Sequence, residues 1–128
     1  MITLKTLKNS TKQEVFDQVV NHLLTQRKQC KTMTFERSDY FELPSGGICA
    51  YRNGEGLKCA AGCFIADDEY KESFEGQKWM NLVDRGCVPL EHSRLITDVQ
   101  YIHDEKNPED WDEYLKSYAK NYSLEYNY

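Results

Sequence analysis

Apolar residues recur with the period of an α-helix in the first third of the chain. Between residues 12 and 28 they lie three and four positions apart, and polar residues occupy the opposite face. The apolar positions are Val15, Phe16, Val19, Val20, Leu23 and Leu24. Thr11 and Glu14 have the spacing of a capping box, in which each side chain bonds the backbone N–H of the other. We therefore predict an amphipathic helix over 12–28.

The second half of the chain predicts three more helices. Residues 90–104 place Leu95, Ile96, Val99, Ile102 and His103 on one face. Asn107-Pro108 followed by acidic residues has the character of a helix start, with a capping residue, proline at the first position and acids in the first turn. We predict helices over 90–104 and 108–120, and a short one over 77–83 that Gly86 ends.

The middle of the chain has features of short strands. Residues 48–52 and 57–59 flank Asn53-Gly54, which is typical of a β-hairpin turn. Residues 31–43 suggest a short strand or an irregular extended segment, and the small residues of 59–65 suit a short helix or turn. The order of helix, hairpin and helices predicts an α+β fold, a helix-rich single domain with a small antiparallel β-hairpin or sheet.

Length and composition predict one globular domain. The 128 residues, of which 40% are hydrophobic and 29% charged, are enough for one core. We take 1–128 as the domain and expect that 1–11 and 121–128 can fray. No apolar run approaches the roughly 20 residues that span a bilayer, and the N-terminus lacks a secretion signal. We therefore expect no membrane partner and a location in the cytosol.

The net charge of −5 is unevenly distributed along the chain. Residues 1–37 carry seven basic residues against three acids, whereas the rest carries nine against eighteen. This basic third allows a nucleic-acid-binding hypothesis. Its residues are Lys5, Lys8, Lys12, Arg27, Lys28, Lys31 and Arg37. An uneven solvated surface explains the same pattern.

The five cysteines allow a metal or thiol hypothesis. Cys49, Cys59 and Cys63 fall close together, and the predicted hairpin would bring Cys49 opposite the residues after Cys59. Zinc needs about four ligands, which Cys30, Cys87, His92 or His103 would complete. The chain has one C-x3-C pair and no C-x2-C pair, so buried thiols without a cofactor are the preferred interpretation.

Catalysis by Cys59 is a further hypothesis that the sequence allows. Lys58 and a helix start would activate Cys59, with His103 or His92 as the base. Apolar neighbours favour an inert thiol instead. The common signatures of nucleotide-binding proteins, serine hydrolases and zinc peptidases are absent from the sequence. We therefore expect a protein that is not an enzyme, although an enzyme remains an open alternative.

Residues 49–70, which we call the cysteine segment, also resemble part of a known protein family. Cys49-Ala-Tyr-Arg52, with Gly56-Leu-Lys-Cys-Ala-Ala-Gly-Cys-Phe-Ile-Ala-Asp-Asp-Glu-Tyr70, resembles a family of small uncharacterised proteins from bacteriophages and bacteria. The turn His22 to Gln26 and the triplet Ile102 to Asp104 extend the resemblance over most of 12–115. Phe64 stands where leucine is usual. The resemblance implies a bacterial cytosol and a phage or mobile-element origin, and it transfers no activity or catalytic residue.

Tyrosines at a spacing of four mark the C-terminal region as a candidate partner surface. They would form one stripe if the helix continued to the end of the chain. The proposed surface comprises Tyr114, Tyr118, Tyr122 and Tyr126 with the acidic residues Glu109, Asp110, Asp112 and Glu113. Docking of this helix on the core is the alternative explanation.

These observations rank three functions. The first is a non-enzymatic phage or mobile-element accessory protein that binds and modulates a host protein, with inhibition as the expected effect. The second is a small metal-stabilised or thiol-dependent protein that uses Cys49, Cys59 and Cys63, with zinc as its only candidate cofactor. The third is nucleic-acid binding through the basic N-terminal third.

Overall fold

The structure is dominated by helices. A computed structural model describes residues 1–32 and 48–128, and the side chains of 1–31 and 50–128. Its longer helices are α1 (Lys12–Gln26), α2 (Trp79–Asp84), α3 (Ser93–Glu105) and α4 (Trp111–Asn121). Short 3-10 helices are η1 (Leu7–Asn9), η2 (Ala61–Phe64), η3 (Glu72–Phe74) and η4 (Pro108–Asp110). The predicted segment 31–43 lies mostly outside the described residues.

The predicted helix at 12–28 is confirmed as α1. Both hydrogen bonds of the capping box form: the Glu14 N–H donates to the Thr11 hydroxyl at 3.1 Å, and the Thr11 N–H donates to the Glu14 carboxylate at 2.8 Å. The helix ends at Gln26 because Arg27 adopts a left-handed conformation with φ 55°. All six predicted apolar side chains of this helix are buried.

The helices of the second half are also confirmed. α3 buries the predicted face, including His103, which is completely buried. The segment after Asn107 begins with η4, and the Asn107 side chain caps no backbone N–H. Trp111 fixes this junction instead, since its fully buried indole donates to the Lys106 carbonyl at 3.0 Å.

The prediction of an α+β fold with a hairpin is wrong. Among the described residues, about half lie in helices, whereas strand structure is confined to two strands of two residues each. The described residues pair as strands only where β1 (Lys31–Thr32) meets β2 (Ile48–Cys49), in antiparallel register, apart from one isolated bridge between Arg52 and Lys58.

Within the described ranges, the two sides of the predicted hairpin are joined by only two backbone hydrogen bonds, from the Cys59 N–H to the Tyr51 carbonyl at 3.3 Å and from the Asn53 N–H to the Leu57 carbonyl at 3.2 Å. The Glu75 carboxylate accepts the backbone N–H groups of Tyr51 and Arg52, at 2.9 and 3.3 Å. The Asn53 side-chain oxygen accepts the N–H groups of Glu55 and Leu57, at 3.0 and 3.1 Å. The N–H groups of Tyr51 and Leu57, which would extend the ladder, are therefore bonded to side chains, a competition typical of Asn.

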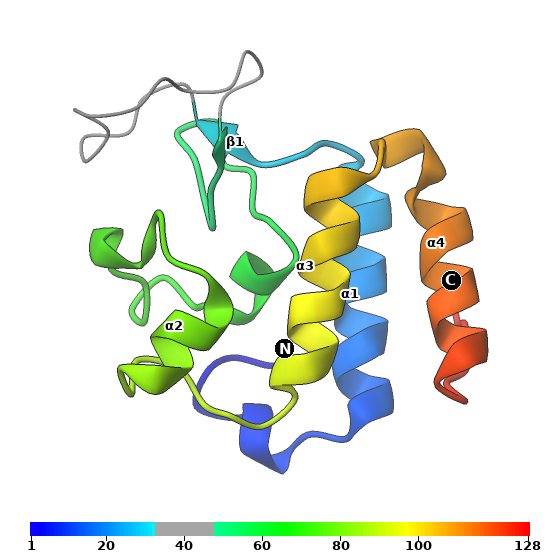
Figure 1. Ribbon diagram of the computed structural model, residues 1–128, viewed down its shortest axis with the longest axis horizontal. Coiled ribbons are helices and arrows are strands. Elements are labelled where there is room, and N and C mark those ends of the chain that lie inside the picture. The colour runs from blue at the N-terminus through cyan, green and yellow to red at the C-terminus, as the bar shows by residue number, and fades with distance from the viewer. Residues whose placement is uncertain (33–47) are drawn as a thin grey trace.

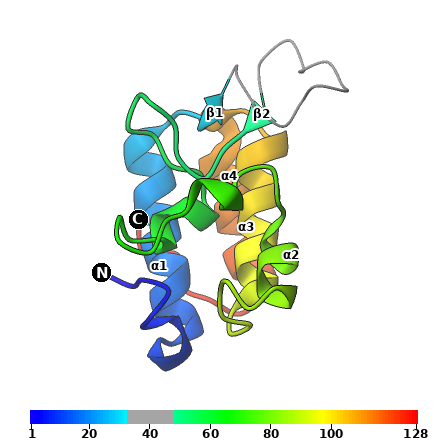
Figure 2. The same cartoon turned by 90° about the vertical axis from the view of Figure 1, so that its left-hand side faces the viewer.

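The core lies where α1, α3 and α4 pack against one another. Figure 1 shows α3 in front of α1, with α4 on one side and α2 on the other. The irregular segment that contains η2 covers α1 and α3 from the side away from α4, and β1 and β2 lie together near one end of the helices (Figure 2). Phe64 and Ile65 of this segment are buried in the same core.

Both ends of the chain contact this core. Leu7 of η1 is completely buried, and the Gln18 side chain bonds the N–H and the carbonyl of Ile2 at 2.7 and 2.9 Å. At the other end, the Gln13 side chain bonds both the N–H and the carbonyl of Glu125, at 2.8 and 2.9 Å.

Candidate functional site

The four C-terminal tyrosines do not form one stripe. α4 ends at Asn121, and Ser123 takes a left-handed conformation with φ 56° that turns the chain back. The returning chain places the Tyr126 hydroxyl against Asp112, at the start of α4. Tyr126 therefore lies apart from the tyrosines of the helix.

Tyr118 and Tyr122 form a stacked pair on the α3 side of α4. Their ring centroids are 4.4 Å apart, and the Tyr118 hydroxyl donates to Asp98 of α3 at 2.9 Å. Burial, together with that carboxylate, raises the pKa of Tyr118. Tyr114 lies one turn earlier, with the Lys106 ammonium 4.7 Å from its ring centroid. Tyr118 is half-buried and docks the helix, whereas the rings of Tyr114 and Tyr122 are exposed.

The four acidic residues gather at the start of α4. Glu109 and Asp110 belong to η4, and Asp112 and Glu113 to the first turn of α4. Negative charge at this position interacts favourably with the helix dipole. Tyr122 lies at the opposite end of this helix of 11 residues, about 16 Å away. The acids therefore do not surround the stacked pair.

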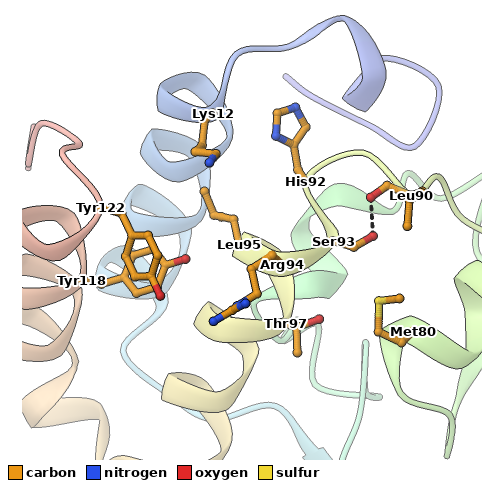
Figure 3. A pocket seen from close by; sticks show the side chains of 10 residues that line it. All are labelled: Lys12, Met80, Leu90, His92, Ser93, Arg94, Leu95, Thr97, Tyr118 and Tyr122. Atoms are coloured by element: carbon orange, nitrogen blue, oxygen red, sulfur yellow. Dashed lines mark hydrogen bonds between the residues drawn. The ribbon is translucent and has the colours of Figure 1, made fainter.

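A hollow of about 580 Å³ lies beside that pair (Figure 3). Lys12, Tyr118 and Tyr122 line it on one side of the first turns of α3, and Met80 and Leu90 line it on the other. The remaining lining residues are His92, Ser93, Arg94, Leu95 and Thr97. The charged residues of this lining, Lys12 and Arg94, are both basic, and Arg94 bonds Asp98 at 3.3 Å.

A second hollow, of about 550 Å³, lies between α2 and the last turns of α3. Three aromatic side chains line it, those of Tyr51, Trp79 and Tyr101. Its charged residues are Glu75, Lys78, Asp104 and Glu105. The net charge of this lining is therefore negative, whereas that of the first hollow is positive.

The two hollows adjoin, because Met80 and Thr97 line both. We call them together the α3 surface. Of seven large hydrophobic side chains that are exposed in the described part of the chain, four line it. These are Met80, Leu90, Tyr101 and Tyr122, with exposed fractions of 40%, 63%, 59% and 43%. An apolar surface of this kind is typical of an interaction site.

Sequence reasoning did not identify the α3 surface, although a signal exists. Arg94, Thr97, Tyr101 and Asp104 recur at helical spacing opposite the buried face of α3. The contribution of Met80 and Leu90 depends on how α2 and the following loop pack, which no periodicity in the sequence indicates.

The cysteine segment has the properties of a packing element. Cys59 is buried and Cys63 partly buried, and burial raises the pKa of Cys59 well above its ordinary value and that of Cys63 to about 12. Metal binding and nucleophilic attack both need the thiolate, which burial disfavours. Cys49 pairs with Lys31 through the backbone rather than with the residues after Cys59, and its side chain lies outside the description. Within the described ranges, no three potential ligands gather as a metal site would require.

The histidines suggested as bases for Cys59 make other hydrogen bonds. His103 Nε2 accepts the backbone N–H of Cys30 at 2.9 Å, so its proton is on Nδ1, which donates to Asp104 at 2.8 Å. Its ring also stacks on Trp111, with 5.4 Å between centroids. His92 Nε2 lies 2.8 Å from the Ser10 carbonyl. His103 therefore has no free nitrogen to accept a proton from a thiol.

The basic residues of the N-terminal third do not gather in one patch. Lys5, Lys8 and Lys12 lie near the start of α1, and Lys5 pairs with Asp68 at 3.6 Å. Arg27 and Lys28 follow the other end of the helix, about 22 Å away. Arg37 is not among the described residues. Nucleic-acid binding through these residues gains no support from their placement.

In the described part of the chain, no helix has both the length and the apolar character to cross a bilayer. Comparisons of the chain with protein-family models, curated proteins and solved structures found no match.

Proposed function

We propose that this chain is a non-enzymatic binding protein that attaches to a host protein through the α3 surface and modulates it. The observation that carries the proposal is the concentration of exposed apolar side chains there, on both sides of one helix. A phage or mobile-element origin and action in the bacterial cytosol follow from the resemblance of the cysteine segment and belong to the same proposal.

The charges along α3 define the chemistry of the partner. Lys12 and Arg94 lie at its first turns, and near its last turns the carboxylates of Glu75, Asp104 and Glu105 outnumber the single ammonium of Lys78 in the lining. A complementary partner segment carries an acidic group at one end, apolar residues in the middle and a basic group at the other end. Since α3 has 13 residues, the segment spans about 20 Å.

Site-specific crosslinking tests this proposal. A photoreactive residue replaces exposed Thr97 at the centre of the surface, and in a second variant it replaces Asn21, which is exposed on α1. In lysate of the host bacterium, we expect a discrete protein adduct from position 97 and none from position 21. The captured protein is then purified and its affinity for the full chain measured.

Leu90→Asp places a charge in the apolar part of the surface, and we expect at least about a tenfold loss of affinity, which corresponds to about 1.4 kcal/mol. Tyr128→Ser, which changes an exposed side chain away from both hollows, leaves the affinity unchanged. Equal labelling from positions 21 and 97, or a partner that binds Leu90→Asp as tightly as wild type, contradicts the proposal.

A further inference from the structure

The residues that line the hollow between α2 and α3 carry an excess of negative charge, and the Lys106 ammonium lies 5.8 Å from the ring centroid of Tyr101 in the same lining. Three carboxylates, those of Glu75, Asp104 and Glu105, line it against one ammonium, that of Lys78. This excess matters because the space is partly enclosed, and charges interact more strongly there than in bulk water.

Hydrogen bonds hold two of these carboxylates without neutralising them. Asp104 accepts from Gln100 at 2.7 Å and from His103, whose ring is the neutral tautomer because Nε2 accepts an N–H. Glu75 accepts from two backbone N–H groups and from the Tyr70 hydroxyl at 2.6 Å. Among the salt bridges of the described residues, none involves Glu75.

The raised pKa of Tyr51 is consistent with the negative charge of the hollow. Burial is the main reason why the pKa of Tyr51 is raised, and Cys59, Glu75 and Asp104 raise it further. All of these neighbours disfavour a negative charge on the phenol, and its hydroxyl donates to the Gln77 carbonyl at 2.6 Å. A positive charge placed near it experiences the carboxylates of Glu75 and Asp104 as attraction.

Aromatic side chains supply the second part of the site. Tyr51, Trp79 and Tyr101 line the hollow, and a cation over an aromatic ring is attracted by the ring quadrupole. Trp79 is also buried with its indole Nε1 lacking any hydrogen-bond partner in the described part of the chain. Because this atom is itself buried, an acceptor on a ligand reaches it only when neighbouring side chains move aside, and it then satisfies the unpaired donor.

We propose that this hollow is a socket for a lysine or arginine side chain of a partner polypeptide. The cationic group lies between the carboxylates and the aromatic rings, and a carbonyl of the same polypeptide accepts from Trp79. A free polyamine shares the cationic chemistry but has no carbonyl. The socket rests on the proposed function, since it specifies the basic end of the partner segment.

Small probes test the socket without the partner, so its failure is distinguishable from failure of the proposed function. Nitrogen-15 spectra of the full chain contain two indole N–H signals, from Trp79 and Trp111, and Trp111 is bonded to Lys106 outside the hollow. On titration with N-acetyl-argininamide, we expect the Trp79 signal to shift and saturate while the Trp111 signal stays in place.

N-acetyl-citrullinamide, the neutral analogue, should bind at least about tenfold more weakly, which corresponds to about 1.4 kcal/mol. Spermidine should also bind more weakly than N-acetyl-argininamide. Equal binding of citrullinamide overturns the cation socket. Spermidine binding as tightly as the arginine probe overturns the assignment to a polypeptide side chain.

Two variants connect the shift to this site. Tyr101→Leu removes an aromatic ring and Glu105→Gln removes a charge, both at exposed positions, and each should weaken the probe several-fold. Tyr128→Leu is the matched control, because Tyr101 and Tyr128 are both 59% exposed and Tyr128 lies outside the hollow. Unchanged affinity in both Tyr101→Leu and Glu105→Gln overturns the proposal.

Discussion

Gly62 lies directly against the carbonyl group of Tyr51. A Cβ atom at position 62 would lie 2.1 Å from that carbonyl oxygen and 3.0 Å from its carbon, so no side chain fits without backbone movement. Gly62 belongs to η2 and Tyr51 lines the second hollow, so this close approach packs η2 directly against one wall of that hollow.

Gly62→Ala should therefore lower the free energy of unfolding by about 1–3 kcal/mol or more, as overpacking does. Denaturant unfolding measures the loss. Gly54→Ala is the control, because a Cβ at Gly54 has no described atom within 4 Å. Equal stability of the two variants would show that the contact is not tight in solution.

His22 should make the fold sensitive to acid. Burial lowers the pKa of His22 from its ordinary value of 6.5, the hydrogen bond to the Lys58 carbonyl partly opposes this, and the charge of the nearby Lys58 side chain lowers it further. The unfolded chain thus binds the proton at higher pH than the folded chain. Its contribution to stability is complete above the unfolded pKa and is lost as the pH falls through the folded pKa.

His22→Gln retains a donor for Lys58 and cannot titrate. Unfolding at about pH 7.5 and 5.5 should show a smaller acid-induced loss for this variant than for wild type. Asn21→Ala, at the exposed neighbouring position, should keep the wild-type loss. An identical loss in His22→Gln would assign the acid sensitivity to other groups.

The thiols should differ strongly in reactivity. Cys87 is exposed, whereas Cys30 and Cys59 are buried, and burial raises the pKa of Cys30 to about 12 and that of Cys59 well above its ordinary value. In a Cys49→Ser background, a thiol reagent should label Cys87 rapidly and the two buried thiols only when the chain opens.

Mass spectrometry of the labelled peptides makes this measurement. Cys87→Ser in the same background should remove the fast phase. A fast phase at Cys59 in the native protein would instead revive the thiol-dependent alternative.

The C-terminal turn depends on Gln13. Its side chain bonds both backbone groups of Glu125, and Asp17 of the same helix accepts from Asn127 at 3.3 Å. Gln13→Ala should increase hydrogen exchange at Glu125 and hasten proteolysis of residues 124–128, with a global loss of only about 0.5–1.5 kcal/mol. Asn21→Ala again serves as the control. Unchanged exchange at Glu125 would contradict the anchoring role.

The sequence predicted the helices well because their signals are local. The capping box of Thr11 and Glu14 and the apolar faces of α1 and α3 each depend on residues within a few turns. The hairpin prediction failed because the Tyr51 N–H, which would extend the ladder, bonds Glu75 more than twenty residues away. No pattern around Asn53-Gly54 reveals that competitor.

The candidate site was harder to predict for the same reason. The tyrosine spacing located the exposed rings of Tyr114 and Tyr122. A serine gives no indication of a left-handed conformation, so the turn at Ser123 that moves Tyr126 away from the other tyrosines was not predictable. The apolar side chains contributed by Met80 and Leu90 reach the α3 surface only through tertiary packing. Burial of Cys59 and Cys63 was consistent with their small and apolar neighbours.

The charge order along α3 reinforces its helix dipole instead of offsetting it. Acidic side chains stabilise a helix at its first turn and basic ones at its last, whereas α3 has no acid in its first turn and ends with Asp104 and Glu105. Arg94 also precedes Asp98, the less favourable order for a pair four residues apart. The dipole and the side chains thus produce electric fields of the same direction along the surface. A segment that carries opposite charges at its two ends should dock in one orientation, because its reversal would oppose both fields at once.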